Sequence, residues 1–194
     1  MTAPGEVRLI GGQWKRSKLP VPKAGAVRPT TDRIRETVFN WLGQDLSGWR
    51  CLDAFAGSGA LGFEAASRGA GEVLLLELDA KQAASLEASR VRLKGSMLSV
   101  QRVDALAWLR RAPRERFDLV FLDPPFDSEL LAPSLAAALP LLVPGGFIYL
   151  ESRTPLGDVP ADWAIWRQSR AGLVHFQLWR RGYTAAAEPR SSAT

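Results

Sequence analysis

The sequence predicts an α/β protein built on a doubly wound, mostly parallel seven-stranded sheet, with a C-terminal antiparallel hairpin and a small N-terminal β-hairpin extension. Short runs rich in Val, Leu and Ile alternate with amphipathic segments from Trp49 onward, which is typical of parallel strands joined by right-handed helical crossovers. A glycine-rich turn with Gly57, Gly59 and Gly62 directly follows the first apolar run. After Glu151 come two extended runs with no helix between them, which indicates the antiparallel hairpin.

This alternation sets the expected order of elements. Strands are expected at residues 50–54, 72–76, 98–102, 117–122 and 146–150, and helices at 60–68, 80–94, 105–111 and 128–142. The final hairpin is expected at 164–169 and 173–180. We therefore divide the chain into an N-terminal extension (1–29), a main domain (30–183) and a disordered tail rich in Ala and Ser (184–194).

The N-terminal extension is expected to form a short hairpin that leads into an amphipathic helix. Gly11 and Gly12 are expected to form the turn between strands at 7–10 and 13–15, and the prolines that follow favour extended chain. The helix then begins near residue 30 and ends near Gly43. Its apolar face consists of Ile34, Val38, Trp41 and Leu42.

Composition places the protein among single-domain proteins that do not enter a membrane. The 194 residues, 46% of them hydrophobic, suffice for one sizeable core. No apolar run is long enough to cross a bilayer, and the first residues lack the layout of a secretion signal, so we expect a cytoplasmic protein. We also expect it to act as a monomer. Cys51 has no second cysteine to pair with, and His175 has no neighbouring Cys or His with which to hold a metal.

Positive charge is concentrated at the N-terminus. Residues 1–35 carry a formal charge of +6 and the remaining residues sum to −1, within a total of +5. Such a segment suits contact with a polyanion, because each phosphate that it engages releases counterions. The charge alone is equally consistent with a solvated basic tail that has no specific partner.

Four acidic residues lie at the ends of four of the predicted strands or directly after them: Asp53, Glu77, Asp104 and Asp123. Ligands of an open parallel sheet bind at the carboxyl ends of its strands, so these carboxylates are expected to gather at one site. Glu77 lies 18 residues beyond Gly59, a spacing at which an acid accepts hydrogen bonds from ribose hydroxyls. Asp104 can accept from an adenine amino group or can serve as a helix N-cap.

The glycine pattern G-x-G-x-x-G occurs in both nicotinamide and S-adenosylmethionine sites. A pyrophosphate favours the uncovered positive end of a helix, whereas S-adenosylmethionine carries an ammonium and a sulfonium that favour carboxylates. Asp53, just before the loop, therefore favours S-adenosylmethionine and can hold its ammonium group directly or through water. The residues expected to bind this cofactor are Asp53, Phe55, Ala56, Gly57, Ser58, Gly59, Glu77, Leu78, Asp104 and Ala105.

The motif Asp123-Pro124-Pro125-Phe126 indicates methyl transfer to an exocyclic amine of a base. Such an amine is a poor nucleophile because its lone pair is delocalised into the ring, and acceptors at its two hydrogens favour the pyramidal geometry of attack. The Asp123 carboxylate and the Pro124 carbonyl can be these acceptors, and Phe126 can stack on a base turned out of its helix. We expect all four motif residues to be catalytic.

Five segments together resemble a known family: Arg28-Pro-Thr-Thr-Asp-Arg, Asp53-Ala-Phe-Ala-Gly-Ser-Gly-Ala-Leu-Gly-Phe-Glu-Ala, Ser67-Arg-Gly-Ala, Glu77-Leu-Asp and Asp123-Pro-Pro-Phe. The chain resembles the bacterial 16S rRNA guanine-N2 methyltransferases (RsmD-like) over nearly its whole length. The resemblance implies a class I methyltransferase fold with a Rossmann-like sheet and S-adenosylmethionine as donor. It implies as acceptor a guanine exposed in 16S rRNA, within an assembling or assembled small ribosomal subunit.

The resemblance also implies that the N-terminal extension contacts RNA. The residues expected to do so are Arg8, Trp14, Lys15, Arg16, Lys18, Arg28, Thr31 and Arg33. Trp14, among basic residues, can stack on RNA or can instead anchor the hairpin on the core. After this tryptophan, members of the family carry a glycine between basic residues, where this chain reads Lys15-Arg-Ser-Lys.

Three other functions are compatible with the same features. An adenine-N6 methyltransferase acting on DNA or RNA needs the same hydrogen-bond acceptors and shares the Asp-Pro-Pro-Phe motif. A non-catalytic RNA-binding assembly factor can retain the fold, and a nicotinamide-dependent reductase can use the same glycine loop.

Overall fold

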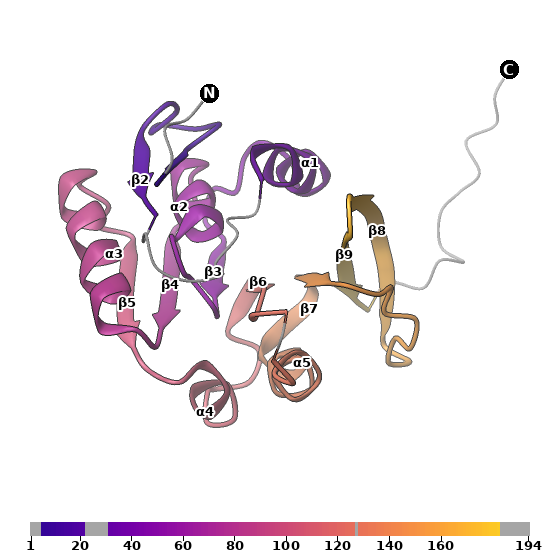
Figure 1. Ribbon diagram of the computed structural model, residues 1–194. Coiled ribbons are helices and arrows are strands. Elements are labelled where there is room, and N and C mark those ends of the chain that lie inside the picture. Colours follow the sequence, from indigo (N-terminus) through magenta and orange to yellow (C-terminus); the bar gives the residue numbers. More distant parts are fainter. Residues whose placement is uncertain (1–4, 22–30, 127, 183–194) are drawn as a thin grey trace, which may run out of the picture.

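The computed structural model describes residues 5–21, 31–126 and 128–182. Seven strands form the main sheet: β3 (Arg50–Asp53), β4 (Glu72–Glu77), β5 (Leu98–Arg102), β6 (Phe117–Leu122), β7 (Leu142–Ser152), β8 (Trp163–Ala171) and β9 (Val174–Arg181). Their order across the sheet is β5-β4-β3-β6-β7-β9-β8 (Figure 1). Strands β3 to β7 run parallel, and β9 pairs antiparallel with both β7 and β8. The predicted fold class, including the C-terminal antiparallel hairpin, is confirmed.

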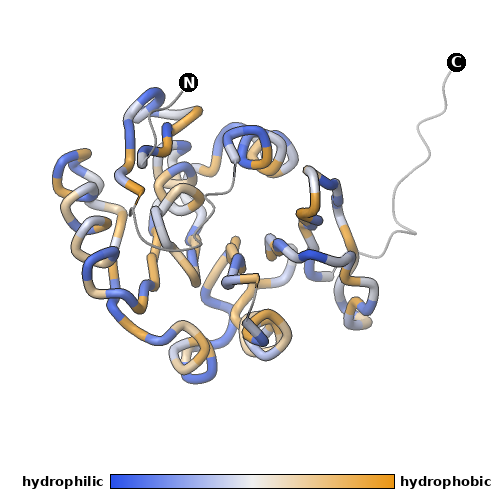
Figure 2. Tube along the Cα trace, viewed as in Figure 1, coloured by the Kyte–Doolittle hydropathy of each residue, from blue (hydrophilic) through white to orange (hydrophobic). Residues whose placement is uncertain are grey.

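Helices cover both faces of this sheet. They are α1 (Asp32–Leu42), α2 (Ala60–Ser67), α3 (Ala80–Arg92), α4 (Ala105–Leu109), α5 (Leu131–Ala138) and the 3-10 helix η1 (Leu139–Leu141). On one face, Phe39 of α1, Phe63 of α2 and Leu86 of α3 join the larger hydrophobic core. On the other face, α4 and α5 cover the second core, which contains Leu109 and Ala138 (Figure 1). Figure 2 shows hydrophobic residues along the central strands and hydrophilic ones on the outward turns of α1 and α3.

The positions of the central strands could be predicted from the sequence because both faces of these strands are buried. In β4, the residues from Val73 to Leu76 are all buried, and in β6 only Asp118 is partly exposed. A strand of this kind appears in the sequence as a continuous apolar run. In the described parts of the chain, no helix combines the length and the apolar character that crossing a bilayer requires.

The segment that joins β6 to β7 differs from the prediction of one helix at 128–142. Helix α5 ends at Ala138, the short η1 follows, and β7 begins at Leu142 rather than at residue 146. Pro140 explains the early end, because proline has no backbone N–H and its ring collides with the preceding helical turn. The helix is therefore shorter and the strand longer than the apolar pattern suggests.

The small N-terminal hairpin is present, but its predicted turn and second strand were wrong. β1 (Glu6–Arg8) pairs antiparallel with β2 (Lys18–Pro20), and Val7 lies opposite Leu19. Residues 13–15 form a turn rather than a strand, with the Lys15 N–H donating to the Gly12 carbonyl at 3.2 Å. Gly12 lies against α2, where an added Cβ would overlap the carbonyl oxygen of Ser67. A residue without a side chain is needed for that approach. The predicted boundary at 29/30, the tail and Arg28 lie outside the described residues.

Candidate active site

The carboxyl ends of four neighbouring strands bring the predicted acidic residues to one edge of the sheet. Asp53, the last residue of β3, lies opposite Leu75 of β4 on one side and Phe121 of β6 on the other. Glu77 and Asp123 each lie two residues beyond those partners, at the ends of the same two strands. We call this side of the molecule the carboxyl edge. It places the glycine loop after β3 beside the Asp123 motif after β6.

Asp53 is a buried carboxylate that has no cationic partner among the described residues. It is 3% exposed, and its Oδ2 accepts a hydrogen bond from the Gly62 backbone N–H at 2.9 Å. Burial, helped by the nearby charge of Glu77, raises the pKa of the Asp53 carboxyl to about 7, and the Gly62 hydrogen bond opposes this shift. A buried acid without a counter-charge is expensive in free energy, so its charged form would be stabilised by a ligand cation.

Glu77 links the end of β4 to the glycine loop. Its Oε2 accepts from the Gly57 backbone N–H at 2.9 Å, and its Oε1 accepts from the Asp79 backbone N–H at 2.8 Å. Gly59, with φ +78°, precedes the first residue of α2, and the helix N-terminus therefore faces the loop. A carboxylate oxygen can accept more than one hydrogen bond, so Glu77 can fix the loop and still bind hydroxyl groups.

The other predicted cofactor residues lie around these two acids. Asp104 is exposed, and its Oδ1 accepts from the Ala107 backbone N–H at 2.7 Å, so it caps α4. Its second oxygen leaves room for another donor, and both of its expected functions are therefore compatible with the geometry. Ala56, Ser58 and Ala105 are buried, Phe55 is half-buried and Leu78 is 63% exposed.

The Asp123 motif forms the turn that leaves β6. Pro124 is buried and Asp123 partly buried, whereas Pro125 is exposed and Phe126 is 36% exposed. The Pro125 carbonyl accepts from the Ser128 backbone N–H at 3.0 Å, which closes the turn. The motif thus presents a carboxylate and an aromatic ring at the edge, on backbone that the prolines restrict.

A buried pair on β7 lies beside the end of β6, and no sequence pattern predicted it. The Tyr149 hydroxyl donates to Glu151 Oε1 at 2.7 Å, and both side chains are buried. Burial and the charges of Glu151 and Asp123 hold the pKa of Tyr149 well above its ordinary value. The period-two pattern of a strand marks such residues only as inward-facing.

The residues around the glycine loop fit S-adenosylmethionine better than a dinucleotide. Asp53 has no cation beside it among the described residues, and Glu77 already occupies the Gly57 N–H group that a pyrophosphate would need. An ammonium, a sulfonium and ribose hydroxyls are the groups that such carboxylates bind.

Comparison with known proteins gives a consistent result. The family described as "Conserved hypothetical protein 95" matches residues 7–180. "Ribosomal RNA small subunit methyltransferase D" of Escherichia coli K12 is 41% identical to this chain over 185 residues, with 91% of each chain covered. The protein of the same name in Haemophilus influenzae is also 41% identical, with 92% of this chain and 95% of that one covered. This chain belongs to the RsmD-like methyltransferase family. A solved structure titled "Putative methyltransferase yhhF from Escherichia coli" has a TM-score of 0.81 at 39% identity, covering 91% of this chain and 98% of that one.

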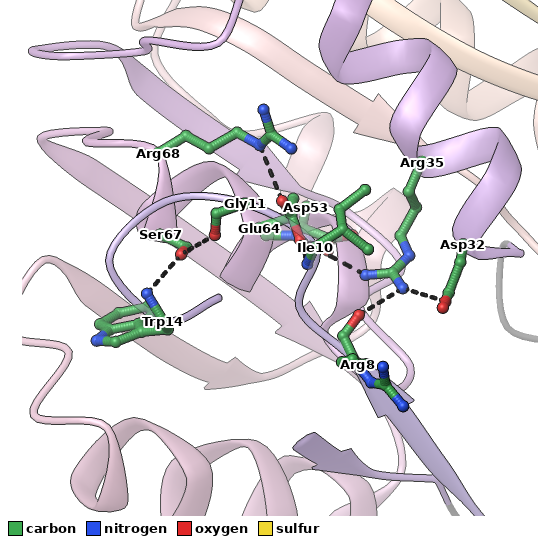
Figure 3. Close-up of polar contacts among 11 residues, drawn as sticks. Arg8, Ile10, Gly11, Trp14, Asp32, Arg35, Asp53, Glu64, Ser67 and Arg68 are labelled. Carbon is green, nitrogen blue, oxygen red and sulfur yellow. Dashed lines mark hydrogen bonds and ion pairs between the residues drawn. The ribbon is translucent and has the colours of Figure 1, made fainter. Parts of the chain in front are cut away.

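In this RsmD-like chain, the N-terminal hairpin is fixed on α2 by close polar contacts (Figure 3). Ser67 Oγ accepts from the Trp14 backbone N–H at 2.9 Å and donates to the Gly11 carbonyl at 2.6 Å. The Trp14 ring is 9% exposed, lies 6.2 Å from the Phe63 ring and borders Gly95, just before β5. Trp14 therefore anchors the hairpin on the core, at the end of the sheet away from the carboxyl edge.

A buried ion network lies beneath the hairpin of the RsmD-like chain. Glu64 of α2 binds Arg68 Nε at 2.8 Å through Oε1, and its Oε2 accepts from the Ile10 backbone N–H at 2.9 Å and lies 3.7 Å from Arg35 Nη1. Arg35 also donates to the Arg8 carbonyl at 2.7 Å and to Asp32 Oδ1 at 2.6 Å (Figure 3). Sequence reasoning missed this network, because its partners are up to 54 residues apart and no local pattern joins them.

The remaining predicted RNA residues of the RsmD-like chain are spread over the hairpin and the start of α1. Lys15, Arg16 and Arg33 are exposed, Lys18 pairs with Glu6 at 2.8 Å, and Thr31 caps α1 through a 3.4 Å bond from the Ile34 N–H. Arg16 has φ +72°, a conformation that favours glycine, in the stretch where the family resemblance implied one.

Proposed function

We propose that this protein transfers a methyl group from S-adenosylmethionine to the exocyclic N2 of a guanine in 16S rRNA. The observation that carries the proposal is the position of Asp123 and Pro124 beside Asp53 and the glycine loop, at the carboxyl ends of adjacent strands. Membership of the RsmD-like family supports it, as do relatives whose names describe methyltransferases of the small-subunit rRNA.

In this proposal the acids of the carboxyl edge divide into two sets. Asp53 would hold the ammonium group of the cofactor, Glu77 its ribose hydroxyls and Asp104 its adenine amino group. When bound, the cofactor supplies an electrophilic methyl group on sulfur. The buried, uncompensated charge of Asp53 and the fixed loop at Gly57 favour a cationic ligand held in one orientation.

The Asp123 turn would act on the guanine. Its carboxylate and the Pro124 carbonyl accept hydrogen bonds from the two N2 hydrogens, which directs the nitrogen lone pair toward the methyl group. Phe126 would stack on the base. After the methyl group has moved from sulfur to N2, a proton of N2 would pass to the Asp123 carboxylate or to water. The exposed cations Lys15, Arg16 and Arg33 would bind phosphates of the RNA away from the target base. The anchored position of Trp14 in the core leaves base stacking to Phe126.

The test compares Asp123→Asn with Asp158→Asn, an exposed acid in the loop before β8. Small ribosomal subunits from a bacterium that lacks this methyltransferase are incubated with labelled S-adenosylmethionine, and the labelled nucleoside is identified after digestion. We expect N2-methylguanosine with the wild type and Asp158→Asn. With Asp123→Asn we expect at least a roughly 10²-fold lower kcat and an almost unchanged Kd for S-adenosylmethionine.

The same assay separates the other candidate functions. Unchanged turnover in Asp123→Asn contradicts the assigned action of this residue, and N6-methyladenosine as product identifies an adenine methyltransferase. A protein that binds the subunits but not S-adenosylmethionine is a non-catalytic assembly factor. Parallel reactions with naked 16S rRNA show whether the RNA alone is the substrate.

A further inference from the structure

The turn of the C-terminal hairpin lies at the same edge as the Asp123 motif. Ser152, the last residue of β7, lies opposite His175 of β9, and His175 in turn lies opposite Arg170 of β8. Arg153, directly after β7, and Arg170 are therefore at corresponding heights of the sheet. Neighbouring strands are about 4.8 Å apart, so the two arginines are roughly 10 Å apart along the edge.

The C-terminal hairpin is basic in a way that the overall charge conceals. Residues 163–182 contain four arginines and no acidic residue. Arg181, at the far end from the carboxyl edge, pairs with Glu115 at 3.1 Å and with Asp162 at 3.6 Å. Arg167 and Arg170 are exposed on β8, the outermost strand of the sheet. We call Arg153, Arg167 and Arg170 the arginine rim. It adjoins a candidate active site whose own ionisable groups are mainly carboxylates.

Exposed apolar and aromatic side chains also lie along the carboxyl edge, near the arginine rim. Among the described residues, four large hydrophobic side chains are exposed, and three of them follow strands at the carboxyl edge or lie in the hairpin turn there: Leu78, Phe126 and Leu173. The Arg153 guanidinium lies 5.9 Å above the Phe126 ring, and Leu173 is 78% exposed. Cations that alternate with stacking surfaces are what a single-stranded nucleic acid binds.

We infer that Arg153, Arg170 and Leu173 form a second RNA-contact surface, which binds the sugar–phosphate backbone on the side of the target nucleotide away from the N-terminal hairpin. This inference rests on the proposed function. The N-terminal hairpin packs over the β5-β4-β3 half of the sheet, and Arg153 and Arg170 lie at the carboxyl ends of β7 and β8 in the other half (Figure 1). A base turned out of its helix is positioned best when the chain is held on both sides.

The experiment compares Arg153→Ala/Arg170→Ala with the matched pair Arg111→Ala/Arg114→Ala. The control arginines are exposed in the loop between α4 and β6 and carry the same total charge. Binding of naked 16S rRNA and of small subunits is measured over a range of salt concentrations, with KM for each substrate, Kd for S-adenosylmethionine and the thermal unfolding midpoint.

For Arg153→Ala/Arg170→Ala we expect KM for both RNA substrates to rise about tenfold or more. A plot of the logarithm of the RNA association constant against the logarithm of salt concentration has a negative slope. The magnitude of this slope should decrease by roughly 0.7 to 0.9 for each phosphate that the variant no longer binds. The Kd for S-adenosylmethionine and the unfolding midpoint should not change, and the control pair should resemble the wild type. Leu173→Ser should raise KM a fewfold without changing the salt slope, since it carries no charge.

Two results would overturn the inference. Equal RNA affinity and salt slope in the two double variants would show that the rim does not bind phosphate. A loss confined to assembled subunits, with naked 16S rRNA bound normally, would show that the rim contacts a protein of the subunit instead. In both cases a wild type that still forms N2-methylguanosine leaves the proposed function intact, whereas an inactive wild type contradicts the proposed function itself.

Discussion

Two buried acids on consecutive elements have opposite surroundings. Glu64, in the middle of α2, is fully buried between Arg35 and Arg68 and also accepts from the Ile10 N–H. Asp53, at the end of β3, is almost as buried but receives backbone hydrogen bonds and no cation among the described residues. The comparison separates an acid whose charge is neutralised within the fold from one whose charge is left for a ligand.

The difference follows from where each acid lies. Glu64 is enclosed by α1, α2 and the N-terminal hairpin, so any missing counter-charge would be a permanent cost of folding. Asp53 lies at the carboxyl edge, where a bound ligand can supply the counter-charge in place of the protein. A buried charge without a partner is therefore expected at a binding site. In the parts of the fold that only support the site, a buried charge is expected to be neutralised by a neighbouring residue.

The largest effect that distinguishes the two acids should come from Glu64→Ala. This change leaves Arg35 and Arg68 buried without their shared partner, and Nε of Arg35 already makes no hydrogen bond among the described residues. We expect the free energy of unfolding to fall by about 3 to 5 kcal/mol, measured by urea denaturation.

The control for this change is Glu87→Ala, which removes a half-exposed acid that binds Arg90 at 2.6 Å on α3. An exposed pair of this kind contributes less than about 1 kcal/mol. If Glu64→Ala costs no more than Glu87→Ala, the network does not hold the hairpin, and the contrast with Asp53 disappears.

A second effect concerns the pH dependence of Asp53. The pKa of Asp53 is about 7 in the folded protein, above the value of an aspartate in the unfolded chain. Between these two pH values the folded protein therefore binds more protons than the unfolded chain does. The associated stability is fully present below about pH 4 and is lost as the pH rises through about 7. A cofactor cation prefers the ionised carboxylate, so S-adenosylmethionine should bind more tightly as the pH rises toward that value.

We therefore expect the Kd for S-adenosylmethionine to fall about tenfold between about pH 5.5 and 7 in the wild type, by calorimetry. In Asp53→Asn the affinity should be lower and nearly independent of pH over this window, because the titrating group is gone. A wild type and a variant with parallel pH profiles would falsify the assignment of Asp53 as the ammonium ligand.

The sequence-based predictions succeeded where the physical signal was local. Strands β3 to β6 were placed within about one residue because apolar runs mark strands buried on both faces, and the acids after them indicated the position of the candidate site. The Glu64 network and the Tyr149–Glu151 pair could not be predicted in this way. Their partners meet only after the sheet and helices have packed, and a charged residue in a helix ordinarily indicates a solvated face.

The same limit explains the error in the N-terminal hairpin. A pair of glycines between apolar residues usually marks a tight turn, and the sequence offers no means of distinguishing a turn from a close approach. Here Gly11 and Gly12 touch Arg68 and Ser67, which lie more than fifty residues further along the chain. The second strand, Lys18–Pro20, therefore lies further along the chain than the glycine pair suggests.

The smallest expected effect concerns Asp104, an acid that is expected both to stabilise the fold and to bind the cofactor. Asp104 caps α4 through the Ala107 N–H and is also the expected partner of the adenine amino group. Asp104→Ala should lower the free energy of unfolding by about 1 kcal/mol and weaken S-adenosylmethionine binding a fewfold. Asp104→Ser retains a side-chain oxygen that can cap the helix but has no carboxylate, so it should restore stability without restoring affinity. If Asp104→Ser restores both, the acid acts only as a helix cap, and cofactor binding at the carboxyl edge depends on Asp53 and Glu77 alone.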